Sequence, residues 1–295
     1  MNYHEPVMVK EVLDFFDVAK GKRYIDCTLG DGGHSIEILK RGGLVLGLEV
    51  NEAQFAKALE RIKGEGLEAN FIGEIGNFKY IENLALKHNF SEIDGILFDL
   101  GYSSSELEDG NLGLSFSRDS VLDMRLDKSL SVTAADLVNT LSQKSLEKLF
   151  FEYGQEKMSR KFVEAIVSTR KLKKIQTTKE LSDLLVSEAP LNYENKRMHP
   201  ATRVFQALRI AVNTELENLS LSLPRAARLL KRSLPGGRMI VISFHSLEDK
   251  IAKDFGRNAR LVVRELTKKP LTPLRSEVEE NRRSRSAKMR IFEKI

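Results

Sequence analysis

The chain has 295 residues, of which 41% are hydrophobic and 30% are charged, and this suits one large domain or a domain with a sizeable insertion. Its apolar runs are shorter than the ~20 residues of a membrane helix, and its N-terminal residues lack the pattern of a signal peptide. We therefore expect a cytoplasmic protein without a membrane anchor. The single cysteine, Cys27, excludes an internal disulfide, and the five histidines show no metal-ligand spacing, so no metal site is expected.

The net charge of +5 is unevenly distributed along the chain. From Lys250 to the last residue there are 14 Lys or Arg against six Asp or Glu, whereas the preceding residues are slightly acidic. A basic segment on an acidic body is typical of a protein that binds a polyanion such as nucleic acid. A solvated charged tail is the alternative interpretation of the same residues.

Strand and helix patterns alternate from residue 23 onward. The predicted strands cover residues 23–29, 44–51, 68–73 and 94–101, and the predicted helices cover residues 34–43, 52–66 and 80–90. Strands that alternate with helices predict βαβ units, and therefore a parallel sheet with helices on both faces.

The pattern changes after the fourth strand. Residues 112–203 carry helix signals only, among them helices at 156–174 and 178–189 and capping-box spacing at Thr133 and Thr177. The alternation then resumes with one long helix over 199–219, a helix from Pro224 and a strand over 238–246. The sequence therefore predicts an α/β domain formed by residues 1–111 and 204–295, with an inserted all-helical domain at 112–203.

The first predicted strand runs into a glycine-rich turn, "IDCTLGDGGHS". No lysine follows the glycines, so the turn is not a phosphate-binding loop of the nucleoside triphosphatases. A dinucleotide fingerprint matches only in part, because Ser35 stands where glycine or alanine is usual. Asp26, four residues before Gly30, and the late segment "LPGGRMIVISF" are typical of class I methyltransferases, so the turn favours S-adenosylmethionine.

Two acidic residues end predicted strands at the edge where an open parallel sheet binds its ligands. Glu49 ends the second strand, where its carboxylate can accept both ribose hydroxyls or can be an ordinary surface acid. Asp99 ends the fourth strand, and Tyr102 follows three residues later. Amino-methyltransferases have an acidic or amide residue and an aromatic residue at the same place. An acceptor beside an exocyclic amine stabilises the charge that develops when the amine attacks a methyl group. Asp99 can instead cap a turn, and Tyr102 can instead be an aromatic residue that packs beneath the loop.

The position of Cys27 limits the chemistry. Methylation of carbon 5 of cytosine needs a thiolate that adds to the ring, and the only thiol lies in the first strand, away from the fourth. Methylation of nitrogen or oxygen by direct displacement is therefore favoured.

With these residues placed, the sequence resembles the bacterial 16S ribosomal RNA cytosine-N4 methyltransferase family, known as RsmH or MraW. The resemblance runs nearly end to end through the motifs "HEPVM", "GDGGHS", "DGILFDLGYSS", "LSFSRDSVLDMRLD", "HPATRVFQALRIAVNTEL", "PGGRMIVISFHSLED" and "NRRSRSAKMR". It implies a class I S-adenosylmethionine-dependent fold with a helical domain after the fourth strand. It also implies that the small ribosomal subunit or its 16S RNA is the partner, and that cytosine 1402 near the decoding centre is methylated on its N4 amine.

The resemblance also implies a set of cofactor contacts, namely Gly32, Gly33, His34, Glu49, Phe78, Asp99 and Glu106. Two of them depart from the family, since relatives commonly have Asp in place of Glu49 and Gln in place of Glu106. Leu112 and Leu114 replace an arginine and an aromatic residue of relatives, and Arg282 replaces a usual proline, so we expect one basic contact to RNA to be lost and another to be gained.

The remaining candidate residues have two interpretations each. His245 can assist catalysis beside Asp99 and Tyr102, or it can brace a loop through Glu248 or Asp249. Arg203 and Arg209 can contact RNA phosphates or brace a domain interface. The exposed phosphate contacts expected near the C-terminus are Arg282, Arg283 and Arg285.

Two other functions remain open. One is methylation of a different substrate, such as DNA or a small amine. The other is nucleic-acid binding by a methyltransferase fold that no longer catalyses a reaction.

Overall fold

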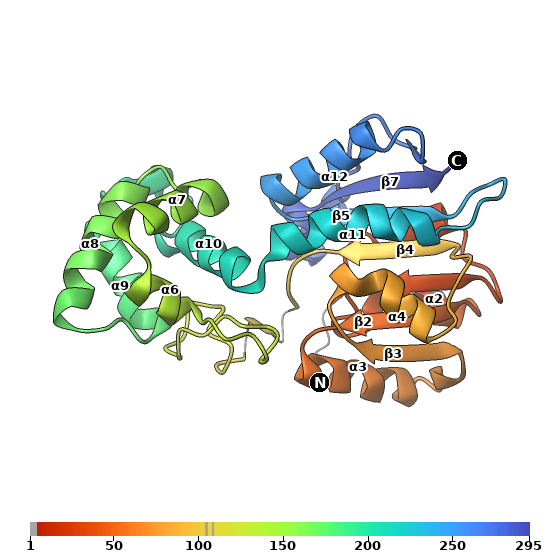
Figure 1. Ribbon diagram of the computed structural model, residues 1–295, viewed down its shortest axis with the longest axis horizontal. Coiled ribbons are helices and arrows are strands. Elements are labelled where there is room, and N and C mark those ends of the chain that lie inside the picture. Colours follow the sequence, from red (N-terminus) through yellow and green to blue (C-terminus); the bar gives the residue numbers. More distant parts are fainter. Residues whose placement is uncertain (1–4, 104–105, 108) are drawn as a thin grey trace. The chain divides into compact units, whose positions relative to one another are not determined.

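The computed structural model describes residues 5–103, 106–107 and 109–295 (Figure 1). His4 and Ser104, which belong to two of the motifs above, lie outside the described residues. The chain forms two compact units, one made of Met1–Ser103 with Leu216–Ile295 and the other of Ser104–Glu215. No helix in the described ranges is long and apolar enough to cross a membrane.

The first unit is built on a seven-stranded sheet with the order β3-β2-β1-β4-β5-β7-β6. Strands β1 to β5 are parallel, and β7 is antiparallel to both β5 and β6. The predicted mostly parallel α/β sheet is thus confirmed. The strands are β1 Arg23–Asp26, β2 Leu44–Glu49, β3 Phe71–Ile75, β4 Gly95–Asp99, β5 Arg238–Ser243, β6 Val263–Glu265 and β7 Lys288–Lys294.

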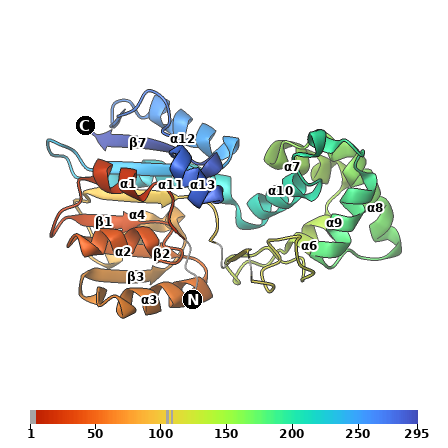
Figure 2. The same ribbon diagram turned by 180° about the vertical axis from the view of Figure 1, so that it is seen from behind.

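Helices cover both faces of this sheet, as Figures 1 and 2 show from opposite sides. Side chains of successive strand residues point to opposite faces, so Ile96 and Phe98 of β4 join the core beneath α4 and α11, whereas Leu97 joins the core beneath α1 and α2. Burial on both faces explains why the central strands read as continuous apolar runs. The helices are α1 Val9–Phe16, α2 Gly33–Lys40, α3 Glu52–Gly64, α4 Ile81–Lys87, α11 Glu215–Leu229, α12 Ser246–Asn258 and α13 Arg275–Glu280.

Short 3-10 helices complete the described elements of the chain. They are η1 Glu68–Asn70, η2 Phe78–Tyr80, η3 Tyr193–Lys196 and η4 Arg282–Ser286. Of these, η1, η2 and η4 belong to the first unit, and η3 belongs to the second.

The second unit is helical and has its own core, in which Phe150, Phe162 and Leu208 are fully buried. The capping boxes predicted at Thr133 and Thr177 are both present, with Asp136 and Glu180 as the reciprocal partners. The described helices are α6 Ala134–Thr140, α7 Gln143–Gly154, α8 Ser159–Leu172, α9 Thr178–Glu188 and α10 Ala201–Asn213.

The boundaries expected at residues 112 and 203 are wrong, because the second unit extends from residue 104 to residue 215. Leu112 and Leu114 are buried in the helical core, and α10 is packed against α7 within the same unit. The two helices approach so closely that a Cβ on Gly154 would lie 2.5 Å from the backbone oxygen of Arg203. A boundary at 203 would therefore divide a helix that is integral to this core.

The single long helix predicted over 199–219 is also wrong. Thr214 adopts the left-handed conformation, with φ of 49°, and separates α10 from α11. The side chain of Asn213 is held at this point by hydrogen bonds with Leu126 and Met124. Pro224, which was expected to begin a new helix, lies inside α11.

Candidate active site

The glycine turn connects the end of β1 to the start of α2. Gly30 and Gly32 have φ values of 52° and 78°, in the left-handed region that glycine adopts without strain. A Cβ on Gly33 would lie 2.9 Å from Cγ of Pro6, so this position has no room for a larger residue. The turn therefore needs its glycines for conformation and for close packing.

Asp26, the last residue of β1, stabilises this turn through hydrogen bonds. Its Oδ2 accepts a hydrogen bond of 2.7 Å from the Ser35 hydroxyl, and its Oδ1 accepts one from the backbone N–H of Thr28. The carboxyl is 1% exposed, and this burial raises its pKa. Asp26 thus links the last residue of β1 to the first turn of α2.

Glu49 is bound to the same turn from β2. Its Oε2 accepts a hydrogen bond of 3.0 Å from the backbone N–H of Gly30, and its Oε1 accepts bonds from Val50 and Asn51. The residue is only 9% exposed, so the interpretation as an ordinary surface acid is wrong. Glu49 thus joins the end of β2 to the glycine turn.

Asp99 at the end of β4 meets His34 from the first turn of α2. Nε2 of His34 lies 3.3 Å from Oδ2 of Asp99. Among the described residues, neither ring nitrogen of His34 nor Oδ1 of Asp99 has a hydrogen-bond partner, although all three atoms are buried. Burial lowers the pKa of His34, but Asp99 and Asp26 raise it more, and the net shift is upward.

Two further members of the expected cofactor set lie in different units. Phe78 begins η2 after β3, and its ring packs edge-on against Phe98 of β4 with 5.6 Å between the ring centroids. Glu106 belongs to the second unit, where it is buried. The carboxyl ends of parallel strands lie at one edge of a sheet, so Phe78 shares that edge with Glu49 and Asp99.

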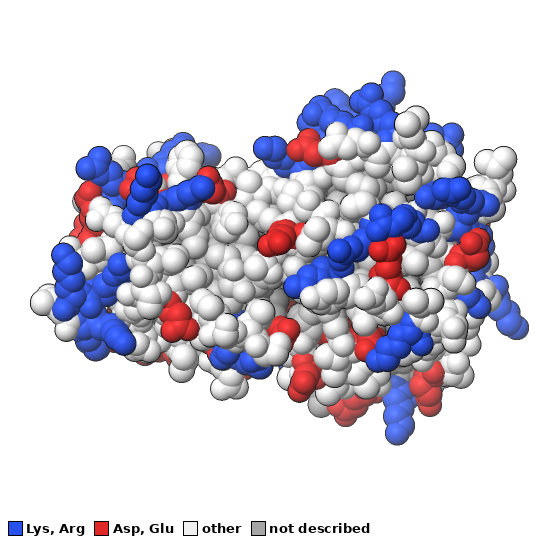
Figure 3. All heavy atoms as spheres, viewed as in Figure 1, with Lys and Arg blue, Asp and Glu red and all other residues white. Residues whose placement is uncertain are grey.

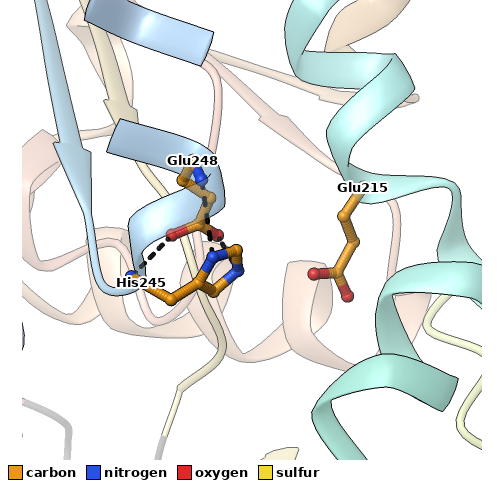
Figure 4. Close-up of side chains that lie close together, drawn as sticks. All are labelled: Glu215, His245 and Glu248. Carbon is orange, nitrogen blue, oxygen red and sulfur yellow. Dashed lines mark hydrogen bonds and ion pairs between the residues drawn. The ribbon is translucent and has the colours of Figure 1, made fainter. Parts of the chain in front are cut away.

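The structure favours the bracing interpretation of His245. Its Nδ1 accepts a hydrogen bond from the backbone N–H of Glu248, whose carboxylate accepts in return from the backbone N–H of His245 (Figure 4). The same carboxylate also accepts from the backbone N–H of Phe244. Nε2 of His245 lies 3.1 Å from the same carboxylate. His245 is therefore the N-cap of α12, at the end of β5.

Tyr102 lies in the loop beyond β4 and is 38% exposed. It follows Gly101, whose φ of 126° is outside the range that most side chains tolerate. Tyr102 is thus partly exposed on the loop that follows the end of β4.

The five candidate arginines fall into two groups. Arg203 forms an ion pair with Glu194, and Arg209, which is 8% exposed, forms two hydrogen bonds with Glu215. These contacts favour a bracing role within the second unit. The other three arginines are exposed on η4, namely Arg282, Arg283 and Arg285.

Sequence reasoning missed the hydroxyl groups that support the site. Thr28 Oγ1 accepts a hydrogen bond of 2.7 Å from the backbone N–H of Asp99 and so joins the segment after β1 to the end of β4. Ser35, which binds Asp26, stood out only as a misfit to the dinucleotide fingerprint. The sequence signal for this contact is a hydroxyl residue at position 35 together with the carboxylate of Asp26 in the preceding strand.

These residues fit an adenosyl cofactor. The glycine turn gives close access to backbone, the unpartnered atoms of His34 and Asp99 can bind a polar ligand, and Glu49 lies where a ribose is expected. Sheet order and turn together define a class I methyltransferase that uses S-adenosylmethionine.

Comparison with known proteins identifies the family. The model of the MraW methylase family matches residues 1–295, so the chain belongs to this family. A curated relative from Carboxydothermus hydrogenoformans, named ribosomal RNA small subunit methyltransferase H, is 40% identical over 99% of this chain and 98% of its own length.

Solved structures of methyltransferases align with the chain at low sequence identity. An rRNA methylase from Streptococcus thermophilus aligns over 96% of this chain and 93% of its own, with 10% identity and a TM-score of 0.46. TrmN from Thermus thermophilus aligns over 98% of this chain and 48% of its own, with 13% identity and a TM-score of 0.45. The fold assignment therefore rests on the sheet order and the family match.

Proposed function

We propose that the protein methylates the exocyclic N4 amine of a cytosine in the 16S RNA of the small ribosomal subunit, at the position known as cytosine 1402. The name of the Carboxydothermus hydrogenoformans relative supports the class of RNA, and the family resemblance supports the atom and the position. The observation that carries the chemistry is the buried, unpartnered Oδ1 of Asp99 at the end of β4.

S-adenosylmethionine supplies the methyl group when it is bound. In the proposed site Glu49 binds the ribose hydroxyls, Phe78 packs against the adenine, and the glycine turn allows the backbone of Gly32 and Gly33 to approach the cofactor. Glu106 is a further proposed contact, by resemblance. The bound cofactor also provides partners for polar atoms of His34 that lack them in the protein alone.

Asp99 acts on the substrate amine. The lone pair of an exocyclic amine is delocalised into the base, so the nitrogen becomes a nucleophile only as it pyramidalises and gains positive charge. A carboxylate oxygen that accepts a hydrogen bond from this amine stabilises the charge as it develops. The contact between His34 and Asp99 Oδ2 leaves Oδ1 as the oxygen that accepts from the amine.

The target base must leave its stack to reach this edge of the sheet. Tyr102, on the loop beyond β4, offers a ring on which the base stacks. The remaining site candidate, His245, is proposed to hold the end of β5 in place through its capping box with Glu248.

The state of Cys27 supports nitrogen over carbon as the acceptor. The thiol is 3% exposed, and burial together with the neighbouring Asp26 raises its pKa well above the ordinary value. A buried thiol of raised pKa is a poor source of the thiolate that carbon methylation needs.

The substrate class is tested by incubating the purified protein with methyl-labelled S-adenosylmethionine and, in parallel, small ribosomal subunits, naked 16S RNA, DNA and free cytidine. We expect label in the ribosomal RNA or the subunit, reduced at least 100-fold in Asp99→Asn and retained in Cys27→Ser. Label on DNA or cytidine alone, or loss of activity in Cys27→Ser with normal folding, would contradict the proposal.

A further inference from the structure

A group of basic residues lies on the outer side of α11 and on the segment that follows it. Arg225 and Arg228 lie on the solvent side of the helix, and Lys231 and Arg232 come shortly after its last residue. Figure 3 shows Lys and Arg gathered in a band over α11. The opposite side of the helix is buried in the core of the first unit, through Leu219, Leu223, Ala226 and Ala227.

The band continues onto η2. Arg225 donates a hydrogen bond to the backbone oxygen of Lys79, which places the two residues side by side. Nζ of Lys79 lies 5.1 Å from the ring centroid of Tyr80, and this ring is 52% exposed. We call the residues Lys79, Tyr80, Arg225, Arg228, Lys231 and Arg232 the α11 basic surface.

Acidic neighbours neutralise only part of this surface. Glu82 binds Arg228 through two hydrogen bonds of 2.7 and 2.8 Å, and Asp94 pairs with Lys231. The surface has five cations, so two such acids leave an excess of positive charge. The side chain of Arg228 is still 58% exposed and keeps N–H groups that Glu82 does not use.

A buried lysine next to this surface is affected by its positive charge. Nζ of Lys294 is enclosed and donates to the backbone oxygen of Ala227 in α11. The pKa of Lys294 is lowered by its burial and further by the charges of Arg232 and Arg228. The charges of these two exposed arginines therefore act on the same buried neighbour.

We propose that the α11 basic surface binds the sugar-phosphate backbone of RNA. Guanidinium groups match phosphate oxygens in geometry and charge, and an exposed aromatic ring beside them accepts a stacked unpaired base. Lys79 and Tyr80 lie on η2 next to Phe78, near the carboxyl edge of the sheet, whereas Lys231 pairs with Asp94 just before β4. The surface therefore runs along α11 from the carboxyl edge towards the amino edge, and its η2 end is the part nearest the proposed site. An acidic protein segment would match the charge but would not use the Tyr80 ring as a stacking platform.

The inference rests on the proposed function, and its test removes charge at two places. Arg228→Gln/Arg232→Gln is compared with Lys253→Gln/Arg257→Gln, which removes two exposed cations from α12. Dissociation constants for a 16S RNA fragment are measured over a range of salt concentrations. Loss of two phosphate contacts predicts a salt slope smaller by about 1.5 and binding about 10-fold weaker at low salt, with little change in the α12 variant.

A third variant gives a change of opposite sign. Glu82→Gln removes the acid that partly neutralises Arg228, so RNA binding becomes tighter, by about 3-fold, and more salt dependent. Retained S-adenosylmethionine binding shows that each variant is folded. Equal weakening in the α11 and α12 variants, or no change in either, would overturn the inference. Absence of RNA binding and methylation in the unaltered protein would instead overturn the proposed function.

Discussion

Nε2 of His34 lies 3.3 Å from Oδ2 of Asp99, so the first turn of α2 directly contacts the end of β4. His34 is 6% exposed, and the carboxylate of Asp26 also acts on its charge. The glycine turn, which is proposed to hold the cofactor, and the acid proposed to bind the substrate amine are therefore coupled electrostatically. A substitution of Asp99 should therefore change the pKa of His34.

This coupling predicts a pH-dependent contribution of His34 to stability. Because its pKa is raised on folding, protonated His34 stabilises the fold fully below the unfolded value of about 6.5 and progressively less as the pH rises through the folded pKa. Replacement by Gln should cost about 1–3 kcal/mol at pH 5 and less at pH 9. Denaturant unfolding across this range provides the measurement, and a cost that grows with pH would contradict the assignment.

The role of Asp99 predicts a separation between catalysis and cofactor binding. Asn retains the size of the side chain but loses the negative charge, so Asp99→Asn should reduce the rate of methyl transfer by about 100- to 1000-fold. Affinity for S-adenosylmethionine should fall much less, because Glu49 and the glycine turn remain. Single-turnover kinetics and calorimetric titration measure the two effects, and equal losses in both would assign Asp99 to cofactor binding alone.

In the second unit, Asp123 predicts acid sensitivity. Its carboxylate accepts two hydrogen bonds from the side chain of Arg125 and one from the backbone N–H of Arg125, and it lies 3.0 Å from Nζ of Lys128. Burial raises the pKa of Asp123, but these cations lower it to about 2. The stabilisation is therefore present above the unfolded value of about 3.9 and is lost as the pH falls towards 2.

At neutral pH, Asp123→Asn should cost about 2 kcal/mol of the free energy of unfolding. The control is Asp183→Asn, which removes an exposed helical ion pair with Lys179 and should change the free energy of unfolding far less. A similar small cost at both positions would show that the Asp123 cluster does not stabilise the helical unit.

Two glycines predict opposite responses to the same substitution. Gly32 has φ of 78°, so Gly32→Ala should destabilise the fold by about 1–2 kcal/mol and weaken binding of S-adenosylmethionine. Gly64 ends α3, and a Cβ there would have no neighbouring atom within 4 Å, so Gly64→Ala should stabilise the fold by up to about 1 kcal/mol. Thermal unfolding of both variants tests the pair, and stabilisation by Gly32→Ala would contradict the strained turn.

The α/β order of the first unit could be predicted because its signals are local. The central strands are apolar on both faces. The capping boxes of the second unit are local signals as well, because Thr133 and Thr177 each have the reciprocal partner three residues later. The carboxyl-edge positions of Glu49 and Asp99 follow from the strand pattern alone.

Other features depend on contacts between distant residues. The break at Thr214 is accompanied by bonds from Asn213 to residues more than 80 positions away, and no local pattern encodes it. Strand β7 contains Arg290, whose charge is compensated by Asp249 and Glu265. From the sequence alone, its charged residues are indistinguishable from those of the basic C-terminal segment. The contact between His34 and Asp99 likewise appears only when β1 and β4 are paired.

The central claim is that the methyl group is attached to N4 of cytosine in small-subunit RNA. The most direct test is mass spectrometry of nucleosides from 16S RNA treated with the protein and isotope-labelled S-adenosylmethionine. Labelled N4-methylcytidine, absent after treatment with Asp99→Asn, is the predicted result. Labelled 5-methylcytidine, or label on a ribose oxygen with no N4-methylcytidine, would contradict it.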